Sequence, residues 1–176
     1  MHSLFFFYFV CILFLPPDWA TLKRTINEYE RKHIHPVWQA QHIRLYKQMP
    51  PKEREELSSL RANYVQQQRA LSQWQATPTL LETRNQILKK MQQIRTALIP
   101  IQEKYNNLLE TFANERNKLK TKWQTDIQQL IAQYNAQIDN ETRPFFAKER
   151  VGMYDDEDEF LLWLSEAESA AGARED

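Results

Sequence analysis

The stretch Thr79–Ile138, TLLETRNQILKKMQQIRTALIPIQEKYNNLLETFANERNKLKTKWQTDIQQLIAQYNAQI, decides the fold of this chain. Its apolar residues recur every three or four positions, which is the spacing of one face of an α-helix. The members of this apolar seam are Ile87, Met91, Ile94, Leu98, Ile101, Tyr105, Leu108, Phe112, Leu119, Trp123, Ile127, Leu130, Tyr134 and Ile138. Only the step at Glu115-Arg116 is polar. A fully helical seam would extend about 78 Å.

A proline interrupts this long helical pattern. Pro100 lies inside the seam, where a proline removes one ladder hydrogen bond and clashes with the preceding turn. We therefore expect a bend or break at Pro100 that divides the seam into two helices, with a continuous bent rod as the alternative. At the start of the stretch, Thr79 and Glu82 have the spacing of a capping box.

Two further helices are predicted upstream, over Thr21–Gln48 and Lys52–Trp74, separated by Pro50-Pro51. Pro36 is expected to kink the first of them or to start another helix. With short connectors, about four helices favour antiparallel hairpins. The fold class is therefore all-α, and residues 21–140 form a thin, elongated, cradle-like helical domain. Because a thin fold covers little of its apolar surface, a homodimer is an open alternative.

Glycine is absent from the first 151 residues, and Gly152 is the first one in the chain. Phosphate-binding loops, dinucleotide fingerprints and nucleophile elbows all need glycine where the backbone turns tightly or approaches a ligand. The body of the chain therefore lacks these motifs. We expect a protein that is not an enzyme and needs no cofactor.

Charge divides the chain into a basic body and an acidic tail. Thr21–Val151 holds 22 Lys and Arg against 13 Asp and Glu, whereas Gly152–Asp176 holds nine acids and one Arg. We expect residues 141–176 to form a largely irregular acidic tail with a short apolar segment at 160–164. That segment is interpreted either as a short docked helix or as a tethered peptide for a groove. The opposite charges predict that the tail lies on the body and screens it.

Residues 1–20 form an N-terminal segment with the apolar run Leu4–Leu15, closed by Pro16-Pro17. A run of 12 residues is shorter than the roughly 20 that cross a bilayer. Its length suits a signal peptide, which indicates export to the periplasm or cell envelope. An uncleaved membrane anchor is the alternative, and membrane contact is otherwise not expected.

Chemistry-bearing side chains are few. The chain's single cysteine, Cys11, lies in the apolar run and excludes a disulfide within one chain. His33, His35 and His42 are weak candidates for metal ligands, but no third ligand is fixed near His35 and His42, so we interpret all three as ordinary surface histidines and assign no metal. We expect no nucleic-acid partner, because lysines that alternate along a helix are scattered around it. These lysines are Lys118, Lys120 and Lys122.

Several strings resemble the small exported helical proteins related to the periplasmic Spy-type chaperones. They are Ile34-His-Pro36-Val37, Gln41-His-Ile-Arg44-Leu45, Lys52-x-x-Glu55-x-x-x-x-Leu60-Arg61, Ile99-Pro100-Ile101-x-x-Lys104-Tyr105, Trp123-x-x-Asp126-Ile127 and Phe160-Leu-Leu-Trp163. The chain departs from the family hallmark, Leu-Thr-x-x-Gln before a helix. Met49-Pro50-Pro51-Lys52-Glu53 stands in its place.

The resemblance implies a thin helical cradle, often dimeric, that binds unfolded or partly folded proteins without ATP. The client-binding residues expected on this basis are apolar Tyr64, Trp74, Met91, Tyr105, Phe112 and Trp123, with basic Arg44, Arg61 and Lys104. Positive charge would speed encounter with acidic clients, and exposed aromatic and methionine side chains would hold apolar surface. Two alternatives remain: an adaptor that binds one fixed envelope partner, and a metal-stress sensor that uses the three histidines.

Overall fold

The computed structural model describes residues 18–139, 141–147, 151 and 157–172, and these contain helices but no strand. The all-α prediction is therefore confirmed. Five helical stretches succeed one another, each helical without interruption. They are α2 (Trp19–Tyr29) with η1 (Glu30–Ile34) and α3 (His35–Gln48), then α4 (Pro51–Ala76), α5 (Leu81–Lys104), α6 (Asn106–Trp123) with η2 (Gln124–Gln128) and α7 (Gln129–Gln137), and finally α8 (Glu157–Gly172).

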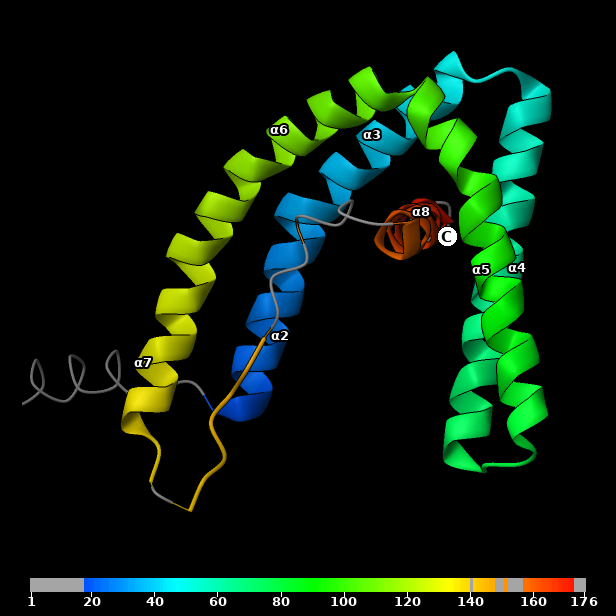
Figure 1. The fold of residues 1–176 in the computed structure, drawn as a ribbon. Helices are drawn as coiled ribbons and strands as arrows, with labels where there is room; N and C mark the ends of the chain where they lie inside the picture. Colours follow the sequence, from blue (N-terminus) through cyan, green and yellow to red (C-terminus); the bar gives the residue numbers. More distant parts are fainter. Residues whose placement is uncertain (1–17, 140, 148–150, 152–156, 173–176) are drawn as a thin grey trace, which may run out of the picture.

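The helices form two arms that meet at an apex (Figure 1). The first arm pairs α2, η1 and α3 with α6, η2 and α7, and the second arm is the antiparallel hairpin of α4 and α5. Within the first arm, the Tyr29 hydroxyl donates to Asp126 at 3.1 Å, and Arg44 lies on the Phe112 ring at 4.9 Å. The predicted antiparallel hairpin is present in the second arm, whereas the first arm pairs helices that are far apart in the sequence.

Near Pro36 the chain remains helical, but the helix changes type. Residues Glu30–Ile34 form a π-helical turn, and α3 begins directly after it with Pro36 in its first turn. The His35 amide donates to the Glu30 carbonyl, five residues back. A π turn of this kind widens the helix locally and is one of the recognised causes of a helix bend. The predicted disturbance at Pro36 takes this form.

The division of the long seam lies at Tyr105 and not at Pro100, so the predicted position was wrong. Pro100 stands inside α5, exposed to solvent, and the helix continues to Lys104. Tyr105 leaves helical geometry with φ −104° and ψ 16°, and α6 begins at the next residue. A single proline removes one N–H, and the neighbouring turns of α5 retain the helix across it.

The predicted capping box at the start of α5 is also absent. Leu80 is the N-cap of this helix and makes no side-chain cap bond. Instead, the carbonyl of Leu80 accepts hydrogen bonds from the Thr83 amide at 3.0 Å and from the Trp74 indole at 3.3 Å. The connector is therefore fastened to the end of α4 rather than capped by Thr79.

The acidic tail was expected to be largely irregular, yet residues 157–172 form the 16-residue helix α8. Three carboxylates in its first turn complement the positive end of the helix dipole. Its apolar positions Phe160, Leu161, Leu164 and Ala167 share one helical face and are buried. The helix contacts α3, α4 and α5. Figure 1 shows α8 between the arms, below the apex and viewed nearly along its axis.

Candidate binding groove between the arms

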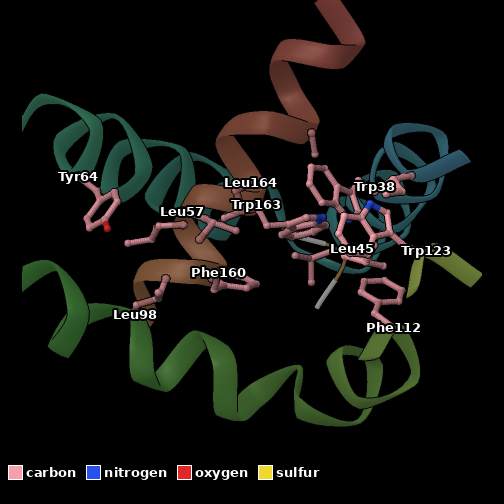
Figure 2. Packing of buried hydrophobic residues seen from close by; sticks show 14 of the residues in the cluster. Trp38, Leu45, Leu57, Tyr64, Leu98, Phe112, Trp123, Phe160, Trp163 and Leu164 are labelled. Atoms are coloured by element: carbon pink, nitrogen blue, oxygen red, sulfur yellow. The ribbon is translucent and has the colours of Figure 1, made fainter. Parts of the chain in front are cut away.

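The space between the two arms is a groove, and α8 occupies it. Figure 2 shows Phe160, Trp163 and Leu164 of α8 packed among side chains of both arms. All three are at most 1% exposed, so the contact between α8 and the arms is as dry as a protein core. The labelled arm residues around them are Trp38, Leu45, Leu57, Leu98, Phe112 and Trp123.

One end of the groove holds α8 through the carboxylate of Glu168. Arg61 of α4 approaches it at 2.6 Å, and the Tyr46 hydroxyl of α3 donates to it at 3.1 Å. Nε2 of His42, also on α3, lies 3.5 Å from the same carboxylate. The hydroxyls of Tyr46 and Ser58 share a further hydrogen bond of 3.1 Å. Glu168 is therefore the point at which α3, α4 and α8 are joined.

The other end of the groove holds α8 through Asp158. Nε and Nη2 of Arg95, on α5, donate to the two carboxylate oxygens of Asp158 at 2.7 and 2.6 Å. Bidentate pairs of this kind fix the direction of approach as well as adding energy. Asp158 and Glu168 are ten residues apart, which is about 15 Å along a helix. The groove therefore binds two carboxylates of α8 that lie a defined distance apart, with the apolar face of the helix between them.

The charge of Glu168 is stabilised by the groove. Burial alone would raise the pKa of its carboxyl group. The neighbouring His42 imidazole, the charge of Arg61 and the hydrogen bond from Tyr46 outweigh burial and lower the pKa below its ordinary value. The docked helix therefore carries an ionised Glu168 at neutral pH.

Most of the predicted apolar client-binding residues are buried rather than exposed. Tyr64, Met91, Tyr105, Phe112 and Trp123 are all at most 8% exposed and belong to the core. Trp74 is half-buried against the α4–α5 connector and under Arg84. The expectation that these side chains are exposed was wrong, because the helical period shows which residues share a face but not what covers that face.

The predicted basic residues lie at three separate places. Arg61 lies in the groove on Glu168. Arg44 pairs with Glu115 at 2.7 Å inside the first arm, and Lys104 pairs with Glu53 at the apex, where Tyr105 also donates to that carboxylate. Only Arg61 therefore belongs to the candidate groove, which Arg95 and His42 complete.

The three candidate metal ligands are not brought together. His33 contacts the Tyr29 ring, His35 contacts the Trp38 ring, and His42 faces α8. The described part of the chain holds no group of three or more His, Cys, Asp or Glu side chains that could bind a metal ion. The metal-sensor alternative has no geometric support in these residues.

A buried polar cluster explains the polar step in the apolar seam. The Gln41 side-chain amide donates to the Phe112 carbonyl and to Glu115, at 3.2 and 3.1 Å. Arg116, only 2% exposed, donates to the Phe112 and Val151 carbonyls at 3.3 and 3.5 Å. Arg116 thereby connects Val151 to α6. The polar step at Glu115-Arg116 was the feature of the sequence that could have indicated this buried cluster.

Comparison with protein-family models, curated proteins and solved structures finds no match for this chain. Among the described residues, no helix combines the length and the apolar character needed to cross a membrane. The predicted signal segment, apart from residues 18–20, lies outside the described residues.

Proposed function

We propose that this chain is an exported, ATP-independent binding protein that holds apolar segments of partly folded proteins in the groove between its arms. In the absence of a client, α8 occupies the groove. The observation that carries this proposal is the chemistry of the contact with α8. A single helix buries Phe160, Trp163 and Leu164 between α3, α4 and α5. A client with a similar apolar face would compete for the same surface.

Two features support reversible rather than permanent docking of α8. The helix belongs to a separate segment, which follows the first glycine of the chain. Its polar contacts also lie at the rim, where Arg61, Arg95, Asp158 and Glu168 keep between a quarter and about a third of their side-chain surface exposed. Partly exposed ion pairs contribute modestly to stability and weaken with salt. These polar contacts therefore add little to the free energy that release of α8 requires.

The arrangement also favours a class of ligand. An amphipathic helix with carboxylates about ten residues apart, on either side of aromatic and leucine side chains, would reproduce the contacts of Asp158 and Glu168. Such a segment would place its apolar face in the groove, as amphipathic helices do in the hydrophobic grooves of other helix-binding proteins. The excess of Lys and Arg in the body would speed its encounter with acidic clients.

The test compares aggregation of several unrelated unfolding proteins in the presence of the full chain and of a variant whose groove is open. Trp163→Asp places a charge at a fully buried position and should release α8. Ser169→Asp adds the same charge at an exposed position of α8 and is the matched control. We expect Trp163→Asp to suppress aggregation at a lower molar ratio than the wild type and the control. No suppression by any of them at several-fold excess would reject client binding.

The bidentate pair of Arg95 with Asp158 favours a second candidate, an adaptor that binds one fixed partner helix in the envelope. Because this pairing is directional, it favours binding of one partner sequence over binding of many different sequences. Crosslinking in the native envelope distinguishes the two candidates. One dominant partner supports the adaptor, and many partners support general client binding.

A further inference from the structure

The carboxylate of Glu168 leaves two buried nitrogen atoms of the groove without a good hydrogen bond. Nε of Arg61 is buried and has no hydrogen-bond partner among the described residues. Nε2 of His42 is buried as well, and the Glu168 oxygen that it faces, at 3.5 Å, lies beyond the usual range of about 2.7–3.2 Å for a hydrogen bond. Buried donors are normally paired, so two unpaired ones at one place indicate an occupant that does not fully match its site.

The second carboxylate of α8 shows the difference between a matched and an unmatched pair. Nε and Nη2 of Arg95 both donate to Asp158, at 2.7 and 2.6 Å, so each carboxylate oxygen accepts from one side of the guanidinium fork. Arg61 instead approaches Oε2 of Glu168 with Nη2 alone, at 2.6 Å. The other oxygen, Oε1, accepts from the Tyr46 hydroxyl at 3.1 Å. Glu168 therefore has no oxygen in position for Nε of Arg61.

The groups that surround the Glu168 carboxylate belong to the body of the protein, and we call them the oxyanion site. His42 and Tyr46 come from α3, and Ser58 and Arg61 come from α4. The hydroxyls of Tyr46 and Ser58 are 3.1 Å apart, and the rings of His42 and Tyr46 pack with centroids 4.2 Å apart. The side chains of Arg61 and His42 are 25% and 13% exposed, so solvent reaches the site. Because none of the four residues comes from α8, the oxyanion site does not leave with that helix.

We propose that the oxyanion site is a receptor for the phosphate group of a ligand, and that Glu168 occupies it as an internal substitute. A phosphate monoester carries three terminal oxygens in a tetrahedral arrangement, whereas a carboxylate has two in a plane. Two phosphate oxygens can accept from Nε and Nη2 of Arg61, as guanidinium forks do with phosphates. The third oxygen is then available to Tyr46 and His42. A phosphate therefore satisfies the donors that Glu168 leaves unpaired.

Charge also favours phosphate over the other groups that could enter the oxyanion site. A phosphate monoester carries about −1.5 to −2 charges at pH 7, and the body holds 22 Lys and Arg against 13 Asp and Glu. A carboxylate would leave Nε of Arg61 unpaired, as Glu168 does. A neutral amide would lose the charge-assisted hydrogen bonds, which are the stronger kind. The order of preference is therefore phosphate, carboxylate, amide.

The experiment empties the oxyanion site with Glu168→Ala and titrates the full chain with inorganic phosphate and with acetate, followed by calorimetry. We expect phosphate to bind at least about tenfold more tightly than acetate, because only phosphate pairs with both nitrogens of Arg61. The Nε–H resonance of Arg61 should shift in the NMR spectrum when phosphate is added. In the wild type, Glu168 competes from within the chain, so phosphate should bind at least about tenfold more weakly than to Glu168→Ala.

Asp158→Ala is the matched control, because it empties the pair with Arg95, where two oxygens already satisfy the fork. We expect its preference for phosphate over acetate to be smaller by about tenfold. Equal preferences in the two variants, or no phosphate binding by Glu168→Ala, would overturn the proposal. Phosphate binding that persists when Arg61→Gln is added to Glu168→Ala would mean an adventitious ion only. Release of α8 by Glu168→Ala would not remove the site, which lies on α3 and α4.

A second titration distinguishes free phosphate from a phosphate carried on a helix, and only this part rests on the proposed function. Peptides of residues 157–172, with Glu168 or with phosphoserine in its place, are added to Trp163→Asp, which is designed to release α8. Binding of the phosphopeptide that is about tenfold tighter assigns the site to a phosphorylated helical ligand. Equal binding of both peptides assigns it to free phosphate. If neither peptide binds while Glu168→Ala binds phosphate, helix binding by the groove fails and the phosphate site stands.

Discussion

At the scale of single residues, Glu168 is the side chain that connects α8 to both α3 and α4. It contacts Arg61, Tyr46 and His42, which come from two different helices of the body. Its lowered pKa means that the folded state binds the Glu168 proton less readily than the unfolded chain. The stabilisation is therefore present above the unfolded pKa of about 4.3 and is lost as pH falls through the lower folded pKa.

We predict that Glu168→Gln weakens docking of α8 at neutral pH by about 1.5 kcal/mol, the lower end for hydrogen bonds to charged groups. The variant should also lose part of the acid-induced release that we expect of the wild type as pH falls through the lowered pKa of Glu168. The indole N–H resonance of Trp163, followed by NMR against pH, measures both effects. Glu110→Gln, an exposed carboxylate on α6, is the control. Identical pH curves for wild type and Glu168→Gln would contradict this role.

Individual residues also show why the candidate site could not be predicted in full. The periodicity that places Phe112 and Trp123 in one seam is a local property of the helix. Their burial depends on α2 and α3 of the same arm, whose contacts with this seam join residues 71 and 97 positions apart. Arg61 was predicted as a binding residue and does line the groove, but Arg95 was not singled out. Nothing local to Arg95 indicates Asp158.

At the scale of elements, the seam from Ile87 to Ile138 forms two helices that meet at Tyr105. The prolines predicted the number of helices in the body correctly, but not the residue at which α5 ends. Pro100 lies in a helix that is held on both sides by regular turns and by packing on α4. The bend therefore has its cause in the tertiary contacts at the apex, where Glu53 binds both Lys104 and Tyr105.

This explanation predicts that Pro100→Ala leaves the arch intact and stabilises the protein. An alanine restores the N–H that proline lacks and suits a helix interior, with a gain of up to about 3 kcal/mol. Thermal unfolding followed by circular dichroism should show a higher midpoint. Pro51→Ala, in the first turn of α4, is the control, because proline costs little at that position. A lower midpoint for Pro100→Ala would show that this proline shapes the bend after all.

At the scale of the whole molecule, α8 is the element that contacts both arms. The described arms meet otherwise at the apex, through the Met49-Pro50 turn and the Tyr105 bend. Burial of several large side chains on α8 stabilises the arms at their observed separation. The acidic tail therefore contains a helix that packs on both arms, a role that its charge alone did not indicate.

We predict that the arms change their separation when α8 leaves the groove. Spin labels at Thr79→Cys and Gln133→Cys, in the Cys11→Ser background, report the distance between the α4–α5 hairpin and α7 by double electron–electron resonance. Addition of Trp163→Asp should broaden and shift the distance distribution, and Ser169→Asp should leave it unchanged. An unaltered distribution with α8 released would mean that the arms are rigid without it.

The sequence by itself determined the all-α class, four helices in the body, the α4–α5 hairpin and the opposite charges of body and tail. These properties follow from local rules, because a helix is held by hydrogen bonds four residues apart and is ended by nearby residues such as proline. Only the tertiary structure decided that the seams face inward, that the seam divides at Tyr105 and that the acidic tail is a helix between the arms. Those outcomes depend on which apolar faces fit together across long sequence separations, and no local pattern contains that information.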